Sequence, residues 1–212
     1  MRIQTLVVAG GQSRRFGGTK ALHKLAGRAF IDHVLDAVTL VPGGEPWVGV
    51  PHVGSDPALT GHLMTRGDVT LIEDHAALQG PLASIAAGLT QADRDGADWL
   101  LAVGCDMPGL RLDLLSALCQ RAVESPSDVL AIVPRTRTAR GPRFQALHGL
   151  YRPSALPAAL AATRLQDFVS SLPGADIVDE PELMDLDPHY ARSVFNVNTP
   201  EDLEALEELF YG

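Results

Sequence analysis

The chain has 212 residues, of which 46% are hydrophobic and 20% charged, and this composition is typical of a globular protein with one α/β domain and a single core. Its formal net charge of −9 and its pI of about 5.1 argue against nucleic acid or an anionic membrane as a partner, because both are bound through basic surface. The first apolar run, residues 6–9, is too short for a signal-peptide core, and no later run approaches the roughly 18 residues of a membrane span. We therefore expect a cytoplasmic protein.

Apolar runs of strand length alternate with segments of helical periodicity, which is the pattern of βαβ units on a parallel sheet. The predicted strands are 3–9, 47–50, 69–72, 98–104, 129–133 and 146–151. The predicted helices contain apolar faces at 31–38, 82–89, 112–122, 156–163 and 203–210. Residues 51–67 are predicted to form a loop, and the Pro-, Gly- and Asp-rich stretch 164–187 receives no element. The predicted fold class is α/β, single-domain, with a Rossmann-like, mostly parallel sheet and helices on both faces.

The two cysteines are predicted to pack in the core. Cys105 and Cys119 each lie inside an apolar pattern, and two such residues do not form a disulfide framework or a zinc site. The histidines show no metal-ligand spacing, so neither zinc chemistry nor a Ser-His-Asp triad has support.

The glycine-rich segment "LVVAGGQSRRFGGTK" after the first strand predicts a polyphosphate loop. It is not a P-loop, because its lysine follows "GGT" and does not precede Ser or Thr, and Gly10 and Gly11 do not supply a G-x-G-x-x-G fingerprint. Glycines still let the backbone approach a ligand closely, and Arg14, Arg15 and Lys20 add positive charge. The alternative is an ordinary turn after a strand.

Asp106 follows the most apolar predicted strand, in "AVGCDMP", and is a candidate cation ligand. Ligands in open α/β sheets lie beyond the carboxyl ends of strands, and Mg²⁺ takes one or two protein oxygens alongside water and substrate phosphates. The alternative is an aspartate that caps the helix predicted from residue 112 or that lies in a turn before it.

Two further segments carry polar groups whose role is not explained by capping alone. In "FNVNTPEDL", Thr199 and Pro200 suit a helix start, whereas Asn196 and Asn198 share one face of an extended segment and offer a second oxygen ligand. In "DHAALQGPLASI", the turn at Gly80 starts a helix whose exposed backbone groups can meet a nucleotide, and a plain helix start is the alternative.

Four arginines lie close together in "PRTRTARGPR", an unusual positive charge on an acidic protein. They are Arg135, Arg137, Arg140 and Arg143. Such a cluster is suited to phosphate contacts, and a solvated loop is the alternative.

The five ordered motifs "VVAGGQSRRFGGTKAL", "GPLASI", "CDMP", "ALHGLYRPSALP" and "FNVNTPEDL" resemble those of the molybdenum cofactor guanylyltransferase (MobA) family of nucleotidyltransferases. The resemblance implies the nucleotide-diphospho-sugar transferase type of α/β fold. It also implies transfer of GMP from GTP to the terminal phosphate of molybdopterin, with Mg²⁺ as cofactor and pyrophosphate as product. GTP, molybdopterin and proteins that deliver molybdopterin are the partners it suggests.

The resemblance also implies roles for particular residues. The nucleotide would be bound by Ala9, Gly10, Gly11, Lys20, Asp74 and Gly80. Catalysis would use Arg15, Lys20 and Asp106, and the metal would be held by Asp106 and Asn198. Apart from the resemblance, acceptor contacts are assigned to Arg137, Arg140 and Arg143 on their charge alone. Asn196 is added to them, with the GTP part at about 1–110 and the acceptor part at about 111–212.

Two features depart from the family's pattern. Thr19 stands where the family usually has Asp before the lysine, and the last third matches poorly until Phe195. Three alternatives remain: cytidylyl transfer to molybdopterin, nucleotidyl transfer to a sugar phosphate, and a non-catalytic protein that binds nucleotide or cofactor.

Overall fold

The structure is a computed structural model that describes residues 1–9, 12–13, 18–139 and 141–211, without the side chains of 12, 13, 210 and 211. Its strands are β1 (Ile3–Val8), β2 (Gln12–Ser13), β3 (Gly18–Thr19), β4 (Lys24–Leu25), β5 (Arg28–Ala29), β6 (Trp47–Val50), β7 (Thr70–Glu73), β8 (Trp99–Gly104), β9 (Ala131–Thr138), β10 (Gly141–Phe144), β11 (His148–Tyr151) and β12 (Ala175–Asp179). Its helices are α1 (Phe30–Val38), α2 (Pro57–Arg66), α3 (Pro81–Arg94), α4 (Leu112–Glu124), α5 (Leu156–Ala161), α6 (Leu165–Ser171), α7 (Glu180–Leu186), α8 (Tyr190–Ser193) and α9 (Pro200–Tyr211), with 3₁₀ turns η1 (Lys20–Leu22) and η2 (Pro153–Ala155).

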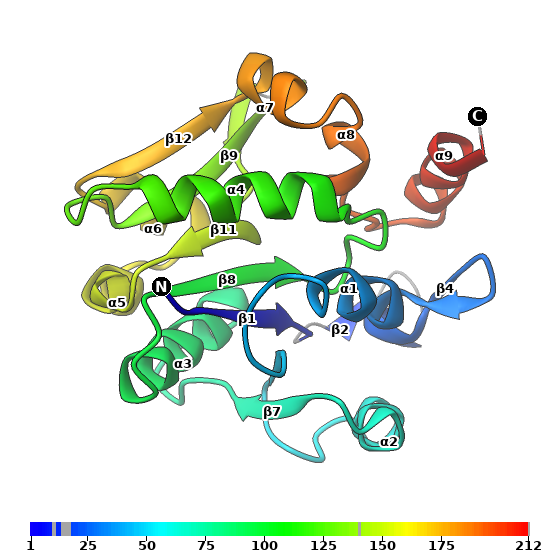
Figure 1. The fold of residues 1–212 in the computed structure, drawn as a ribbon. Coiled ribbons are helices and arrows are strands. Elements are labelled where there is room, and N and C mark those ends of the chain that lie inside the picture. The colour runs from blue at the N-terminus through cyan, green and yellow to red at the C-terminus, as the bar shows by residue number, and fades with distance from the viewer. Residues whose placement is uncertain (10–11, 14–17, 140, 212) are drawn as a thin grey trace.

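The large sheet is parallel around its centre, as predicted. Its strand order is β10-β9-β11-β8-β1-β6-β7, and β12 pairs with β9. β1 is buried along its whole length and pairs in parallel with both β8 and β6, and β6 pairs in parallel with β7. The carboxyl ends of these four strands therefore meet at one edge of the sheet (Figure 1).

The other half of the sheet is mixed. β11 is antiparallel to both β8 and β9, β10 forms an antiparallel hairpin with β9, and β12 is parallel to β9. Since β9 thus runs in the same direction as β8, its carboxyl end also points to the edge at which β1 and β8 end.

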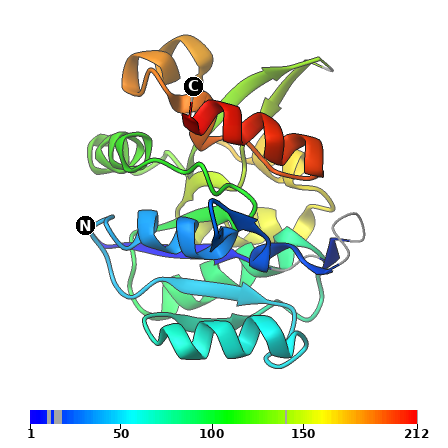
Figure 2. The same ribbon diagram turned by 90° about the vertical axis from the view of Figure 1, so that its right-hand side faces the viewer.

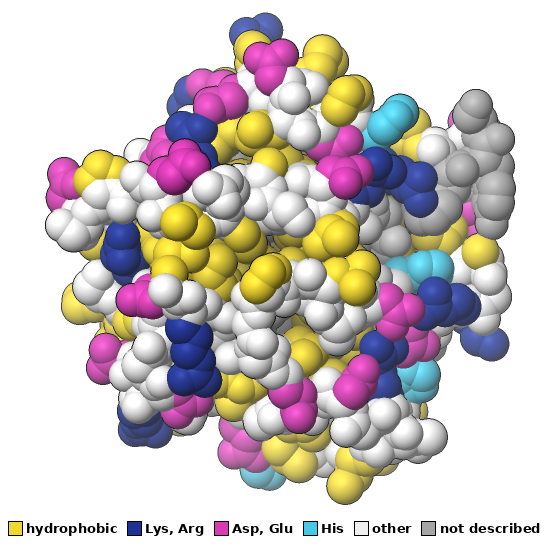
Figure 3. All heavy atoms as spheres, in the orientation of Figure 1, with side chains coloured by type: hydrophobic (Ala, Val, Ile, Leu, Met, Phe, Trp, Pro, Cys, Tyr) yellow, Lys and Arg dark blue, Asp and Glu magenta, His cyan; other side chains and the backbone are white. Residues whose placement is uncertain are grey.

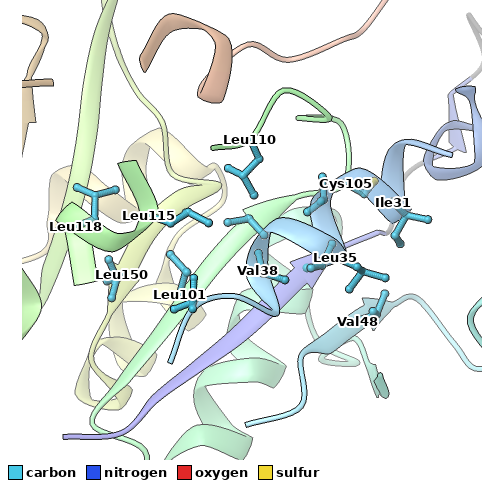
Figure 4. Packing of buried hydrophobic residues seen from close by; sticks show 14 of the residues in the cluster. Ile31, Leu35, Val38, Val48, Leu101, Cys105, Leu110, Leu115, Leu118 and Leu150 are labelled. Carbon is cyan, nitrogen blue, oxygen red and sulfur yellow. The ribbon is translucent and has the colours of Figure 1, made fainter. Parts of the chain in front are cut away.

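Helices cover both faces of the sheet, as predicted, and each face has its own buried cluster. On one face α1 packs through Ile31 and Leu35 against Val48, and α4 packs through Leu115 and Leu118 beside Leu150 (Figure 4). On the other face α3, α5 and α6 enclose the second cluster. The prediction for the cysteines is confirmed: both are buried, and burial raises the pKa of each thiol to about 12.

Ion pairs tie neighbouring elements on the face covered by α1 and α4, where basic and acidic side chains are interspersed (Figure 3). Arg66 of α2 lies 2.7 Å from Asp36 of α1. Arg121 of α4 contacts Asp176 of β12 and Glu182 of α7. These contacts join segments that are distant in sequence.

The predicted loop at 51–67 was wrong, because it contains α2. Asp56 caps this helix by accepting a hydrogen bond from the Leu59 N–H at 3.0 Å, Pro57 occupies its first turn, and Gly67 ends it with a left-handed φ of 73°. Only Leu59 and Leu63 of the helix are buried, so its apolar periodicity is weak. The capping residues were the better signal.

Two more segments differ from the sequence-based expectation. The stretch 164–187 contains α6, β12 and α7, which pack at the β9 side of the sheet. The arginine-rich segment belongs to the β9–β10 hairpin, so Arg135, Arg137 and Arg143 lie on strands and not in the loop of the alternative, although Arg137 and Arg143 are exposed. Arg140 lies outside the described residues.

The last helix packs across the edge at which β1 and β8 end (Figure 2). Leu206 of α9 is buried with Leu25, Phe30 and Val197, and Leu203 packs against this group, as predicted. The side chain of Phe210 lies outside the described part of the structure. Among the described residues, no helix is long and apolar enough to cross a membrane.

Candidate active site

The carboxyl ends of β1 and β8 bring together residues from three distant parts of the chain. The parallel ladder continues past both strands, because the Cys105 N–H donates to the Val8 carbonyl at 3.1 Å and the Ala9 N–H donates to the Gly49 carbonyl at 3.1 Å. Asp106 therefore follows β8 at the edge of the sheet where β1 ends at Val8. Figure 2 looks onto this edge.

Lys20 is the centre of this constellation. Its ammonium donates to Asp106 Oδ2 at 2.7 Å and to Asn198 Oδ1 at 2.8 Å. The side chains of Lys20 and Asp106 are only 14% and 20% exposed. The structure thus joins the predicted phosphate-binding lysine to both predicted metal ligands.

Asp106 does not cap a helix, so the capping alternative is wrong, although the residue does lie in a turn after β8. The N-cap of α4 is Arg111, whose own side chain makes no capping hydrogen bond. The carbonyl of Asp106 accepts the Val197 N–H at 2.9 Å, which fastens the asparagine segment to the end of β8. A Cβ atom at Gly104 would lie 2.5 Å from Asp106 Oδ1, so the carboxylate occupies a place that only glycine leaves open.

The second carboxylate oxygen of Asp106 is relevant to metal binding. Oδ1 is buried and has no hydrogen-bond partner in the described structure. The described residues include no group of three or more His, Cys, Asp or Glu side chains that would hold a metal by themselves. One carboxylate with one amide oxygen nevertheless suits Mg²⁺, which keeps waters and takes substrate phosphates as further ligands. The residues present therefore fit the expected ion.

The two asparagines have different surroundings. The backbone N–H groups of Asn198 and Thr199 donate to Asp202 Oδ2 at 2.8 and 2.9 Å, and the Asp202 N–H donates to Thr199 Oγ1 at 3.2 Å. This cap leaves the side chain of Asn198 facing Lys20. The amide of Asn196 instead donates to the Val194 carbonyl at 3.2 Å.

A second polar group lies where β6 and β7 end. The Asp74 N–H donates to the Val50 carbonyl at 2.8 Å, and the Asp74 carboxylate accepts a hydrogen bond from the Ser84 hydroxyl on α3. Burial raises the pKa of Asp74, although the bond from Ser84 opposes the shift. Gly80, with a φ of 65°, provides the turn immediately before α3. Asp74 and Gly80 therefore flank the start of α3 at the same sheet edge.

Thr19, directly before Lys20, has a partner that the sequence did not predict. Its hydroxyl donates to Asp56 Oδ2, so a carboxylate from α2 lies beside the position at which the resembled family usually carries one. A cavity of about 180 Å³ lies next to this contact. It is lined by Ala9, Gly18, Thr19, Val50, Pro51, His52, Ser55, Asp56, Leu59 and Thr60.

The arginines of the β9–β10 hairpin are divided between two faces. Pro142 is the cross-strand partner of Arg137, whereas Thr136 is the partner of Arg143, so these two arginines project to opposite sides. Arg137 is 87% exposed and lies 3.9 Å from Glu180. Arg135 makes two hydrogen bonds of 2.7 Å with Asp179. Gly10, Gly11, Arg15 and Arg140 lie outside the described residues.

The chain matches a known protein family. The model of the family described as MobA-like NTP transferase domain matches residues 5–175. The chain belongs to this family.

Relatives of the MobA-like family match the chain over most of its length. A protein of Synechococcus elongatus named as a probable molybdenum cofactor guanylyltransferase is 31% identical over 210 residues, which cover 98% of this chain and 99% of the relative. A Nostoc protein of the same name is 30% identical, and the alignment covers 98% of this chain and 92% of the Nostoc protein.

Solved structures share the fold. The molybdopterin-guanine dinucleotide biosynthesis protein A of Archaeoglobus fulgidus superposes with a TM-score of 0.76 at 23% identity, with 98% of each chain covered. The 4-diphosphocytidyl-2C-methyl-D-erythritol synthase of Anaerococcus prevotii superposes with a TM-score of 0.71 at 13% identity, covering 100% of this chain and 96% of that one. The predicted nucleotidyltransferase type of α/β fold is thereby confirmed.

Sequence reasoning missed two residues that support the site of this MobA-like chain. Ser84 belongs to the predicted apolar helix, and its bond to Asp74 had no signal in the sequence. Asp56 did have one, since an aspartate directly before a proline is a typical helix start. Its contact with Thr19 follows only once α2 is in place.

Proposed function

We propose that the protein transfers GMP from GTP to the terminal phosphate of molybdopterin and releases pyrophosphate. The observation that carries the proposal is the convergence of Lys20, Asp106 and Asn198 at the edge of the sheet where β1 and β8 end. Ligands of open α/β sheets bind beyond such strand ends. The names of relatives that align over nearly the whole chain support this choice of reaction.

Mg²⁺ is the cofactor of this proposal, held by Asp106 and Asn198. When bound there, it would neutralise charge on the triphosphate and on the leaving pyrophosphate. The unpartnered Oδ1 of Asp106 and the amide oxygen of Asn198 are the hard oxygen donors that support this assignment.

Lys20 supplies the positive charge of the protein itself. Its ammonium donates to Asp106 and Asn198, and on nucleotide binding it would exchange these oxygens for phosphate oxygens. Ala9, Gly10 and Gly11 would bring backbone N–H groups to the phosphates, with Arg15 nearby in sequence. Because phosphoryl transfer depends on alignment and charge stabilisation, the proposal requires no protein nucleophile.

Asp74 and Gly80 are assigned to the nucleoside side. The Asp74 carboxylate retains acceptor capacity beyond its bond with Ser84 and would accept from the exocyclic amino group of guanine. Gly80 leaves room at the start of α3, since no atom of the described part of the chain beyond its immediate neighbours lies within 4 Å of the place that a Cβ would take. Residues 1–110 would thus form the GTP part.

Residues 111–212 would form the acceptor part. Arg137, Arg140, Arg143 and Asn196 are its proposed contacts with the acceptor phosphate. Since Arg137 and Arg143 project from opposite faces of the hairpin, one phosphate would meet only one of them directly. Of these two, Arg137 is strongly exposed, although Glu180 lies close to it. A protein that delivers molybdopterin is the protein partner that fits this reaction.

The test is pyrophosphate release by the purified protein with Mg²⁺, molybdopterin and each of the four nucleoside triphosphates. We expect release with GTP alone, and only when the acceptor is present. Release with CTP in place of GTP would replace guanylyl by cytidylyl transfer, and release with a sugar phosphate as acceptor would replace molybdopterin. Binding of GTP by calorimetry without turnover on any acceptor would indicate a carrier protein.

A further inference from the structure

The contact between Thr19 and Asp56 links the residue before Lys20 to a helix on another part of the chain. Thr19 ends β3 and is the N-cap residue of η1, with φ −69° and ψ 110°. Its side chain makes no capping bond to η1 and instead donates to Asp56 Oδ2. The hydroxyl therefore bonds to the N-cap residue of α2 and not to a group of its own turn.

Asp56 is itself firmly held. Its Oδ1 accepts the Leu59 N–H at 3.0 Å, so one carboxylate oxygen caps α2 while the other holds Thr19. Burial raises the pKa of Asp56, but the hydrogen bonds from the Leu59 and Ala58 backbone and from Thr19 outweigh burial, and the pKa lies below its ordinary value. The group is therefore a carboxylate at neutral pH, and its bond with Thr19 is charge-assisted.

The Thr19–Asp56 bond lies beside a cavity. Gly18 and Thr19 line this cavity of about 180 Å³ together with Leu59 and Thr60 of α2. The Thr19–Asp56 bond joins the two segments beside this cavity. On its other side the segment is held by the buried side chain of Ala21.

We propose that Asp56 is a positioning residue that acts through Thr19, fixing the backbone at Lys20 so that its ammonium stays within reach of the bound triphosphate. This inference rests on the proposed role of Lys20. Neither Asp56 nor Thr19 needs to touch the nucleotide. Their contribution is to limit the movement of the segment that carries Lys20 when its ammonium leaves Asp106 and Asn198.

The first test removes the bond from either side without removing the helix cap. Thr19→Val keeps the shape of the side chain and removes the hydroxyl, and Thr19→Ser keeps the hydroxyl. Asp56→Ser retains a good N-cap but is too short to hold both Leu59 and Thr19. We expect Thr19→Val and Asp56→Ser each to weaken GTP binding by about tenfold in calorimetry, the size of one charge-assisted hydrogen bond. Thr19→Ser should retain the wild-type affinity.

Two controls separate positioning from general damage. Thr60→Val removes a hydroxyl that lines the same cavity and makes no hydrogen bond to described residues 18–22, so its GTP affinity should match the wild type. The double variant Thr19→Val/Asp56→Ser should be no weaker than either single variant, because both remove the same bond.

The deciding experiment repeats Thr19→Val in a Lys20→Ala background. If Thr19 acts through Lys20, its substitution has no further effect on GTP affinity once the ammonium is gone. A tenfold loss that persists in that background would overturn the inference, as would unchanged affinity of Thr19→Val in the wild-type background. Wild-type protein that binds no GTP would refute the proposed function and this inference together, whereas normal GTP binding by both variants would refute the inference alone.

Discussion

The ammonium of Lys20 lies 2.7 Å from the carboxylate of Asp106, although 86 positions separate the two residues in the chain. Asp106 follows the carboxyl end of β8, which pairs in parallel with β1, and Lys20 follows β3 in the segment that lies at this same edge. The lysine balances the charge of the carboxylate that is proposed to hold Mg²⁺. The same relationship makes both residues sensitive tests of the proposed reaction.

Replacing Lys20 by Ala should reduce turnover by a factor on the order of 10²–10³, comparable to removing one preorganised donor from a transition-state site. The expected effect is on kcat, measured by pyrophosphate release at saturating GTP and acceptor. A normal unfolding transition would show that the loss is not due to misfolding. A kcat near that of the wild type would exclude the proposed role of Lys20.

Gly104→Ala should abolish Mg²⁺-dependent turnover while leaving the fold intact. The new methyl group would lie 2.5 Å from Asp106 Oδ1 and would push the carboxylate from its position. Asp106→Ala should have the same effect on activity. Gly61→Ala is the matched control, because among the described residues no atom outside its own helix lies within 4 Å of the place that the new Cβ would take. Alanine in a helix should stabilise the protein by roughly 0.5–1 kcal/mol relative to glycine. Circular dichroism measures whether the fold is intact, and a magnesium titration measures turnover. Full activity of Gly104→Ala would show that the new methyl group does not displace the Asp106 carboxylate.

Asn198→Ala should impair turnover far more than Asn196→Ala does. The side-chain oxygen of Asn198 contacts Lys20 at 2.8 Å, whereas the side chain of Asn196 bonds to a nearby carbonyl. Losing one oxygen ligand should also raise the Mg²⁺ concentration needed for half-maximal rate. Comparison of the two variants over a magnesium series checks this, and equal losses would mean that both asparagines act directly.

Arg137→Gln should raise the KM for molybdopterin without changing the KM for GTP, because its exposed guanidinium is proposed to contact the acceptor phosphate. Arg143→Gln tests the opposite face of the hairpin. Arg94→Gln, at the last turn of α3, provides a control of equal charge change. If neither hairpin variant changes the acceptor KM, the acceptor phosphate is bound elsewhere.

The buried apolar strands were predictable from the sequence. The position of their carboxyl ends at one edge of the sheet was predictable as well. β1, β6 and β8 are buried along their whole length, which is why continuous apolar runs identified them. The rule that ligands lie beyond strand ends then placed Asp106 close to the glycine-rich segment. β12 escaped prediction because most of its residues are only partly buried. The Thr19–Asp56 bond escaped because it depends on α2, whose weak apolar face gave no periodic signal.

His148 should make the stability of the protein depend on pH between about 6.5 and 4. Its ring is fully buried, neither nitrogen has a hydrogen-bond partner among the described residues, and burial lowers its pKa from 6.5 to about 4. Below pH 6.5 the unfolded chain takes up a proton at this residue that the folded protein does not, so folding stability falls until the pH reaches about 4 and does not fall further through this group. At pH 5 the loss should be about 2 kcal/mol relative to pH 7. Urea unfolding of the wild type and of His148→Leu at both pH values measures it, since other titrating groups contribute equally to the two proteins. An equal change in stability between pH 7 and pH 5 for both proteins would show that His148 is already protonated in the fold.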